Sequence, residues 1–145
     1  MADPLSMTAS IVGIAAAAGQ GVKLAMTLYR TYNDIQDAPK EAQKLRIGLK
    51  TLIDALRGIQ NFSERDATGR LSKDLLKGFE AAVGSCLDTL DSLHKFTQQF
   101  KQPESRFINY EKTRWILKEG EVRKLTQRIE TDKTTIIVFL TRVSM

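Results

Sequence analysis

The residue types that most often carry catalysis are scarce in this chain. The sequence has one histidine, His94, and one cysteine, Cys86. Both fall within one predicted helix, and their separation places them about 12 Å apart along its axis, too far for a nucleophile to contact its base. No group of histidines, cysteines and carboxylates has the spacing of a zinc site. We therefore expect no enzyme, no metal site and no cofactor, and we interpret both residues as parts of a helix face.

One glycine-containing stretch has the residue types of a phosphate-binding loop. Residues 19–24 read GQGVKL. A P-loop needs Gly-Lys followed by Ser or Thr, but here Lys23 follows Val22 and precedes Leu24. A dinucleotide-binding turn needs a third glycine where Leu24 stands, and a preceding strand that the alanine-rich run does not supply. The spacing therefore argues against nucleotide binding.

Basic and aromatic residues alternate later in the chain, as they do in proteins that bind single-stranded nucleic acid. The residues in question are Arg106, Tyr110, Lys112, Arg114, Trp115 and Lys118. The aromatic members are more simply explained as core or boundary residues of a helical bundle, and no recognised DNA- or RNA-reading motif is present. We expect no nucleic-acid partner.

The most informative stretch is an uncharged run near the N-terminus. Residues 4–22 carry no formal charge, and about 18 residues is the lower limit for crossing a bilayer. The run consists largely of Ala, Gly, Ser and Thr. Its small residues recur four apart, which lets helix backbones approach closely in membranes and in soluble proteins alike. The pattern leaves two interpretations open: a buried central helix, or a helix that enters a membrane after a trigger.

The elements that position these residues are helical nearly throughout. We expect a first helix capped by Ser6 and ending near Tyr32, and a second helix starting near Pro39. A polar loop is expected over residues 61–70, followed by a third helix from Ser72 to about residue 100. The second helix carries one apolar stripe, at Leu45, Leu49, Leu52, Leu56 and Ile59.

A shorter helical stretch is expected over residues 105–118, followed by a long final helix over residues 122–143. The β-branched residues 134–140 could form a strand, but no second strand is available to pair with it. The fold class expected is all-α: a bundle of four to five helices forming a single domain over residues 1–145. The small-residue N-terminal helix is expected to pack in its core through Gly13, Ala17 and Gly21.

The net charge of +5 is unevenly distributed. Residues 39–61 hold five basic and two acidic groups, and residues 105–145 hold nine basic and five acidic groups. Such surfaces favour anionic partners, including phospholipid head groups. The candidate head-group contacts are Lys40, Lys44, Lys50, Arg123, Lys124 and Arg128. A secretory signal is not expected. Such a signal needs basic residues before its apolar run, whereas here the run is preceded by Asp3 and by no basic residue.

Two stretches carry a family resemblance. Residues 1–14, MADPLSMTASIVGI, resemble the start of the HeLo-like domains at the N-termini of fungal STAND (NOD-like) receptors. Residues 114–125, RWILKEGEVRKL, followed by Ile129 and by DKTTI at residues 132–136, are similar to the tryptophan-containing segment and last helix of that family. The resemblance covers essentially the whole chain, which can be a domain excised from a longer receptor or a protein of one domain.

The resemblance implies a bundle related to the HeLo domain of fungal heterokaryon incompatibility and to the four-helix domain of mixed-lineage kinase-like pseudokinases. In that group a NOD-like receptor or an amyloid signal clusters the domain, as part of innate immunity. The N-terminal helix is then exposed, and the homo-oligomer permeabilises the plasma membrane, causing programmed cell death. The implied location is cytoplasmic at rest and the plasma membrane on activation, with anionic lipids as partners.

The resemblance carries over to individual residues. The family positions implied for the first helix are Leu5, Ser6, Ile11, Gly13 and Ile14. We expect the membrane-targeting helix to include Val12, Ala17, Gly19, Gly21 and Val22 as well. Trp115, Val122 and Leu125 are implied as structural positions. The alternative function is a non-enzymatic homotypic signalling or oligomerisation module without membrane activity, in which the first helix is only part of the core.

Overall fold

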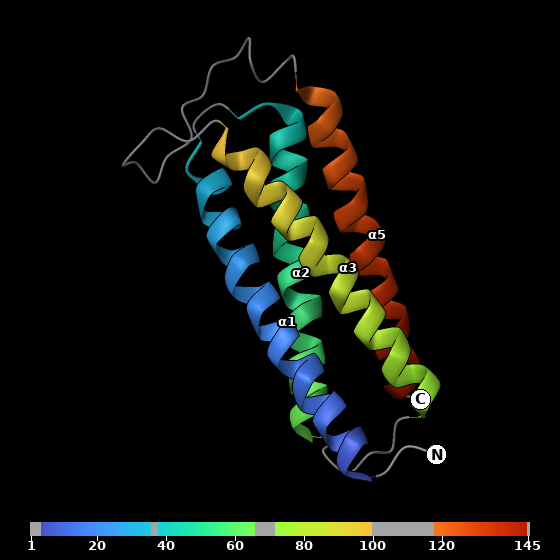
Figure 1. Ribbon diagram of the computed structural model, residues 1–145. Helices are drawn as coiled ribbons and strands as arrows, with labels where there is room; N and C mark the ends of the chain where they lie inside the picture. The colour runs from blue at the N-terminus through green and yellow to red at the C-terminus, as the bar shows by residue number, and fades with distance from the viewer. Residues whose placement is uncertain (1–3, 36–37, 66–71, 100–117, 145) are drawn as a thin grey trace.

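The computed structural model describes residues 4–35, 38–65, 72–99 and 118–144; the side chains of residues 4–10, 63–65 and 143–144 are not described (Figure 1). These residues form four α-helices: α1 (Pro4–Asn33), α2 (Lys40–Arg65), α3 (Lys73–Gln98) and α5 (Glu119–Ser144). No strand occurs among them. The all-α class is confirmed. The helical stretch expected over residues 105–118, with Trp115, lies almost wholly outside the described residues.

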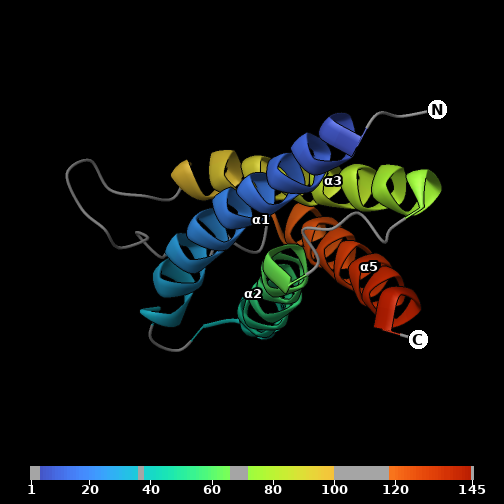
Figure 2. The same cartoon turned by 90° about the horizontal axis from the view of Figure 1, so that it is seen from below.

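The four helices form a bundle in which consecutive helices alternate in direction (Figure 1). Helix α1 packs against α2 and α3, and α5 packs against the same two helices. The order around the bundle is therefore α1, α2, α5, α3, with α2 and α5 running side by side in the same direction. Seen from below, α1 and α3 lie on one side of the bundle and α2 and α5 on the other (Figure 2).

The observed helix ends match the prediction from the sequence at the start of α3 and differ from it at the start of α1 and the end of α3. Ser72 caps α3 as predicted, with extended backbone and a hydroxyl that accepts from the Leu75 N–H at 3.2 Å. The prediction of Ser6 as the first cap is wrong, because α1 already begins at Pro4. Proline is tolerated in a first turn, where its missing N–H would have no partner in any case. Helix α3 ends at Gln98, slightly before the predicted end.

The polar loop expected over residues 61–70 is wrong in its first half, because α2 continues to Arg65. Phe62 supplies the reason. Its ring stacks on that of Phe79 in α3, with the ring centroids 6.1 Å apart. Such an aromatic pair is worth about 0.5–1.5 kcal/mol beyond the area it buries, which favours an extra turn of helix. The polar residues around Phe62 conceal this contact in the sequence.

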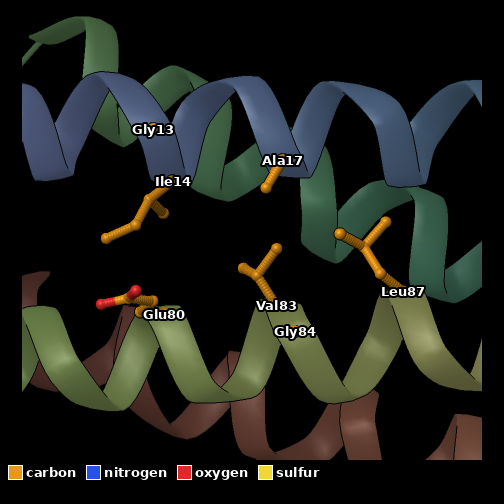
Figure 3. A pocket seen from close by; sticks show the side chains of 7 residues that line it. All are labelled: Gly13, Ile14, Ala17, Glu80, Val83, Gly84 and Leu87. Atoms are coloured by element: carbon orange, nitrogen blue, oxygen red, sulfur yellow. The ribbon is translucent and has the colours of Figure 1, made fainter.

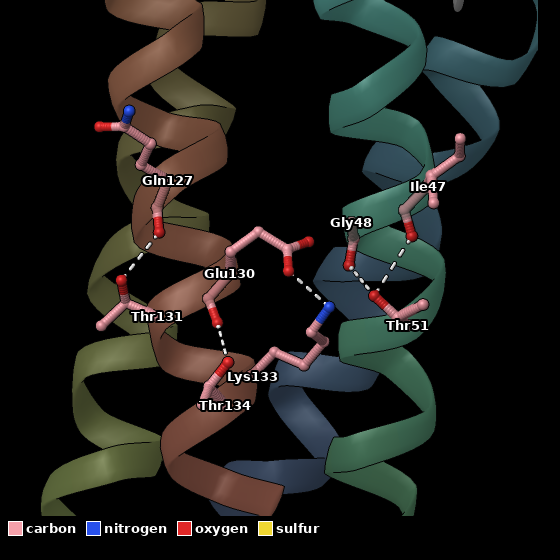
Figure 4. Close-up of polar contacts among 8 residues, drawn as sticks. All are labelled: Ile47, Gly48, Thr51, Gln127, Glu130, Thr131, Lys133 and Thr134. Atoms are coloured by element: carbon pink, nitrogen blue, oxygen red, sulfur yellow. Dashed lines mark hydrogen bonds and ion pairs between the residues drawn. The ribbon is translucent and has the colours of Figure 1, made fainter.

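The β-branched tail of the chain is helical, as predicted, and the hydroxyls of its threonines find partners within the helix. Thr134 donates to the Glu130 carbonyl at 2.8 Å, and Thr131, one turn earlier, donates to the Gln127 carbonyl at 3.0 Å (Figure 4). Such bonds to the carbonyl four residues earlier are compatible with a helix, although they destabilise it slightly. Lys133 adds an ion pair with Glu130 one turn away (Figure 4).

The core is built from apolar stripes on all four helices. The predicted stripe of α2 is confirmed, since each of its members is almost completely buried: Leu45, Leu49, Leu52, Leu56 and Ile59. In α5 the two described positions predicted as structural, Val122 and Leu125, are also buried. Cys86, Leu90 and Leu93 contribute from α3. Burial of each large aliphatic side chain contributes about 1.5–3 kcal/mol to folding.

Two buried polar contacts join α3 to its neighbours. The Asp132 carboxylate of α5 accepts hydrogen bonds from the Ser85 hydroxyl at 2.8 Å and the Thr89 hydroxyl at 2.7 Å. The Tyr32 hydroxyl at the end of α1 lies 2.9 Å from the Thr97 hydroxyl. Since Thr97 donates its own hydrogen to the Leu93 carbonyl, Tyr32 is the donor in that pair. These contacts fix α3 against α5 and against the C-terminal end of α1.

The Asp132 contact predicts an unequal cost for two similar threonine substitutions. Thr89→Val keeps the side-chain shape but removes a donor from a buried carboxylate, so we expect the free energy of unfolding to fall by about 1.5–3 kcal/mol. Thr134→Val, on the exposed face of α5, is expected to change it by less than about 0.5 kcal/mol. Urea unfolding of both variants measures the difference. Equal losses would show that the Asp132 contact contributes no net stability.

Candidate functional site

Helix α1 buries one face and leaves the other open. The large apolar residues Ile11, Ile14 and Val22 are buried, while Val12 is 62% exposed. Among the other residues implied for membrane targeting, Gly21 is buried, Ala17 and Gly19 are half-buried and Gly13 is exposed. Leu5 and Ser6 lie where side chains are not described. The structure therefore divides the predicted set between a core face and a solvent face.

The expectation that α1 packs through Gly13, Ala17 and Gly21 is correct only in part. A Cβ added at Gly21 would lie 3.0 Å from Leu56 Cδ1, so α1 and α2 come very close there. A Cβ at Gly13 would meet nothing within 4 Å, so Gly13 mediates no close packing. The residues that occupy the tightest face are Ala18, Gly21 and Ala25. Bulky Ile11, Ile14, Leu28 and Tyr32 set this rotation, because their burial outweighs the choice between similar small residues.

An apolar groove lies between the N-terminal half of α1 and α3 (Figure 3). Its volume is about 310 Å³, and its lining residues are Gly13, Ile14, Ala17, Glu80, Val83, Gly84 and Leu87. Gly13 and Gly84 are glycines with open space around them, one on each helix. The two glycines leave unfilled the space beside the larger lining residues Ile14, Val83 and Leu87, and this opens the groove. This end of α1 forfeits dispersion contacts that a filled interface would supply.

One helix of the described chain is long and apolar enough to cross a membrane. That segment is Ile11–Asn33 within α1. Of its most apolar stretch of 18 residues, 39% is buried in the bundle. It extends beyond the end of the uncharged run at residues 4–22 and includes the exposed charges Lys23 and Arg30. The core helix of a soluble bundle passes the same test of length and composition, so the two interpretations of α1 both remain.

The basic residues predicted to meet lipid all lie on exposed helix faces. Lys40, Lys44 and Lys50 project from α2. Lys44 contacts Glu41 at 3.7 Å, whereas Lys40 and Lys50 form no ion pair within the described ranges. Between Lys44 and Lys50 stands Ile47, a large apolar side chain that is 58% exposed. This outward face of α2 therefore combines free cations with an apolar residue.

The basic residues predicted to meet lipid on α5 are similarly exposed, and one of them forms ion pairs. Arg123 contacts Glu119 at 3.7 Å and Glu41 of α2 at 4.0 Å. Lys124 and Arg128 have no carboxylate partner in the part of the chain that the structure describes. Exposed ion pairs of this kind contribute about 0–1 kcal/mol, so those of Arg123 would yield readily to a stronger anion.

The two residues of potential catalytic type, Cys86 and His94, differ in their surroundings. The pKa of the Cys86 thiol is raised to about 12, chiefly by burial and further by the Asp132 carboxylate, so the thiol is protonated near neutral pH. His94 is half-buried on α3, with its Nε2 3.4 Å from Gln98 Nε2. Among the described residues, no group of three or more histidines, cysteines and carboxylates is placed to hold a metal ion.

Comparison with known proteins adds one family. Residues 2–145 match the family described as "Pigment biosynthesis cluster protein PigL N-terminal". The chain therefore belongs to this fungal domain family. No curated protein matches the chain, and no solved structure does so either.

The packing of α1 predicts opposite effects for two alanine substitutions. Gly13→Ala is expected to raise the free energy of unfolding by about 0.5–1 kcal/mol, because it removes glycine's backbone entropy without a clash. Gly21→Ala is expected to lower it by about 1–3 kcal/mol, because its Cβ crowds Leu56. Thermal unfolding tests both. Stabilisation by Gly21→Ala would contradict the close approach of α1 to α2.

Cys86 predicts a loss of stability in alkaline solution. Between pH 9 and about 12 the unfolded chain loses the thiol proton while the folded protein keeps it. The free energy of unfolding should therefore be unaffected by the thiol below pH 9, and should fall above it by about 1.4 kcal/mol per pH unit. Urea unfolding across this window measures the slope. Cys86→Ala should show a shallower slope, because the thiol contribution is gone. Tyr32, whose pKa is also raised by burial, contributes equally in both proteins. Equal slopes in the two proteins would contradict a raised pKa of the Cys86 thiol.

Proposed function

We propose that this member of the PigL N-terminal family is a HeLo-type membrane-targeting effector domain of regulated cell death. In this proposal the domain oligomerises, releases the N-terminal half of α1 and permeabilises the plasma membrane. The observation that carries the proposal is the divided character of α1. The helix is apolar and long enough to span a bilayer, yet its N-terminal half lies over an open groove.

The energetics of partial release support the proposal. Over residues 11–22 of α1, where side chains are described, the large buried side chains are those of Ile11, Ile14 and Val22. Exposing them costs about 1.5–3 kcal/mol each, and a bilayer would return that amount. Val12, already 62% exposed, gains by leaving water. The groove beside Gly13 means that few contacts are broken there, whereas release as far as Lys23 also breaks the contact of Gly21 with Leu56.

The charged residues of α1 limit the length of the helix that can enter the bilayer. A charged residue at the centre of a bilayer costs about 2.5–3.5 kcal/mol, which argues against burying Lys23 or Arg30 there. Residues 4–22 are uncharged and, as a helix, extend for about 28 Å, close to the thickness of the hydrocarbon core. The proposed inserted segment therefore ends at Lys23, whose long side chain can reach the lipid head groups.

The outward face of α2 would hold the bundle on the membrane. Lys40, Lys44 and Lys50 are exposed there around Ile47. A lysine near an anionic membrane surface contributes about 1 kcal/mol, and an exposed isoleucine adds apolar contact with the interface. The likeness of residues 1–14 to the HeLo-like domains of fungal STAND receptors supports the same function.

The alternative is a homotypic signalling module without membrane activity. The observation that favours it is the same apolar groove, since exposed apolar concavities mark protein contacts as well. In this alternative the groove is covered by another protein and α1 stays in the core. Self-association without any binding to lipid would support it.

Dye leakage from vesicles tests the membrane proposal directly. The protein would be clustered through a C-terminal histidine tag on vesicles that contain anionic and nickel-chelating lipids. We expect leakage from wild type and its loss in Gly13→Glu. This substitution places a charge in the inserted segment at a position where the folded bundle offers nothing within 4 Å, so folding should be retained.

Gly84→Glu is the matched control. It lines the same groove from α3, is equally uncrowded, and lies outside the segment proposed to insert. It should therefore leak like wild type, and thermal unfolding should verify that both variants fold. Absence of leakage from clustered wild type, or equal leakage from Gly13→Glu and wild type, would refute membrane permeabilisation through α1.

A further inference from the structure

A second cavity lies between α1 and α2 and shares no residue with the groove. Its volume is about 250 Å³, and it is lined by Met26, Tyr29 and Arg30 of α1 and by Lys50, Ile53, Asp54 and Arg57 of α2. Of these, Lys50 alone was among the residues expected to contact lipid. Arg57 lies two turns from Lys50 on α2, and Arg30 joins them only because α1 and α2 pack side by side.

The cavity has an excess of positive charge that the protein does not neutralise. Arg30, Lys50 and Arg57 face one carboxylate, that of Asp54. None of the four forms an ion pair within the part of the chain that the structure describes. The contact that Arg57 does make is a hydrogen bond from Nη2 to the Met26 sulfur at 3.6 Å. A thioether is a weak acceptor, so this guanidinium lacks the anionic partner that its geometry suits.

The remaining lining residues define what else the ligand carries. Met26, Ile53 and the Tyr29 ring give the cavity an apolar wall, and the Tyr29 hydroxyl adds a neutral donor. Pockets for drug-sized ligands usually enclose about 300–1,000 Å³, so this cavity suits a small head group rather than a nucleotide or a large cofactor. Arginine and lysine together are characteristic of phosphate recognition.

We propose that the cavity between α1 and α2 binds a phosphate monoester attached to a small apolar or glycerol-like group. Arg30 and Arg57 bind the phosphate oxygens from opposite helices, and Lys50 adds the third positive charge. Asp54 limits the site to ligands that also offer a donor, such as a hydroxyl group next to the phosphate. The ligand is either the head group of a phospholipid or a soluble phosphate ester.

This proposal does not rest on membrane insertion by α1. Met26, Tyr29 and Arg30 lie C-terminal to Lys23, beyond the segment proposed to leave the bundle. The site would therefore persist in both states of the N-terminal half, and it would exist even if α1 never leaves the core. Failure of the leakage experiment would leave the phosphate site standing, and the converse also holds.

Two binding measurements on the intact protein separate the sources of the ligand. Glycerol 3-phosphate and inorganic phosphate are titrated by calorimetry, and vesicles with and without phosphatidate are tested by flotation. Saturable binding of the soluble ester indicates a soluble ligand. Binding that requires phosphatidate vesicles, without saturable binding of the soluble ester, indicates a lipid head group. Either pattern supports the site, provided that the variants below respond as expected.

The variants are Arg57→Gln and Arg30→Gln, and the control is Lys77→Gln on α3, which lies outside the cavity and outside the residues expected to contact lipid. All three remove one charge from an exposed basic side chain, so thermal unfolding should be nearly unchanged. We expect affinity to fall at least about tenfold in the two cavity variants and less than about twofold in the control. Equal losses in Arg57→Gln and Lys77→Gln, or no saturable binding in either measurement, would overturn the proposal.

Discussion

The close approach of α1 to α2 at Gly21 is the constraint that sets how α1 lies in the resting bundle. Leu56 of α2 is fully buried and lies against the position where Gly21 has no side chain. Because the Leu56 side chain packs directly on the α1 backbone here, α1 lies close enough for its bulky residues farther along, Leu28 and Tyr32, to reach the core. The same approach places Arg30 beside the basic face of α2. Packing and surface chemistry therefore have a common origin.

The sequence predicted the helices well because each of α2, α3 and α5 carries an apolar stripe that permits one rotation. It predicted the rotation of α1 poorly for an identifiable reason. Small residues fill most positions from Gly13 to Gly21, so spacing rules fit several rotations equally well. Ile11, Ile14 and Tyr32 decide among them through burial. The extra turn of α2 was missed because Phe62 acts through Phe79, a partner distant in sequence.

The candidate sites, too, could be predicted from the sequence only where they depend on a single helix. Exposure of Lys40, Lys44 and Lys50 follows from the stripe of α2 and was predictable. The groove beside Gly13 requires Gly84 to stand opposite, and the cation cavity requires Arg30 to meet Arg57. Such juxtapositions depend on which helices are neighbours, which periodicity within one helix does not encode. A sequence therefore locates single faces, while a site formed between two helices needs the packed structure.

The distribution of buried polar contacts argues that any release of α1 is partial. Asp132 joins α5 to α3 through Ser85 and Thr89, and the Tyr32–Thr97 bond joins the C-terminal end of α1 to α3. Beside the groove, by contrast, the lining residues of α1 contribute only apolar contact. Hydrogen bonds in the dry core are costly to leave unmade, whereas apolar contact can be exchanged for lipid at little net cost. The segment before Lys23 can therefore open as a local unit while α2, α3, α5 and the end of α1 stay assembled.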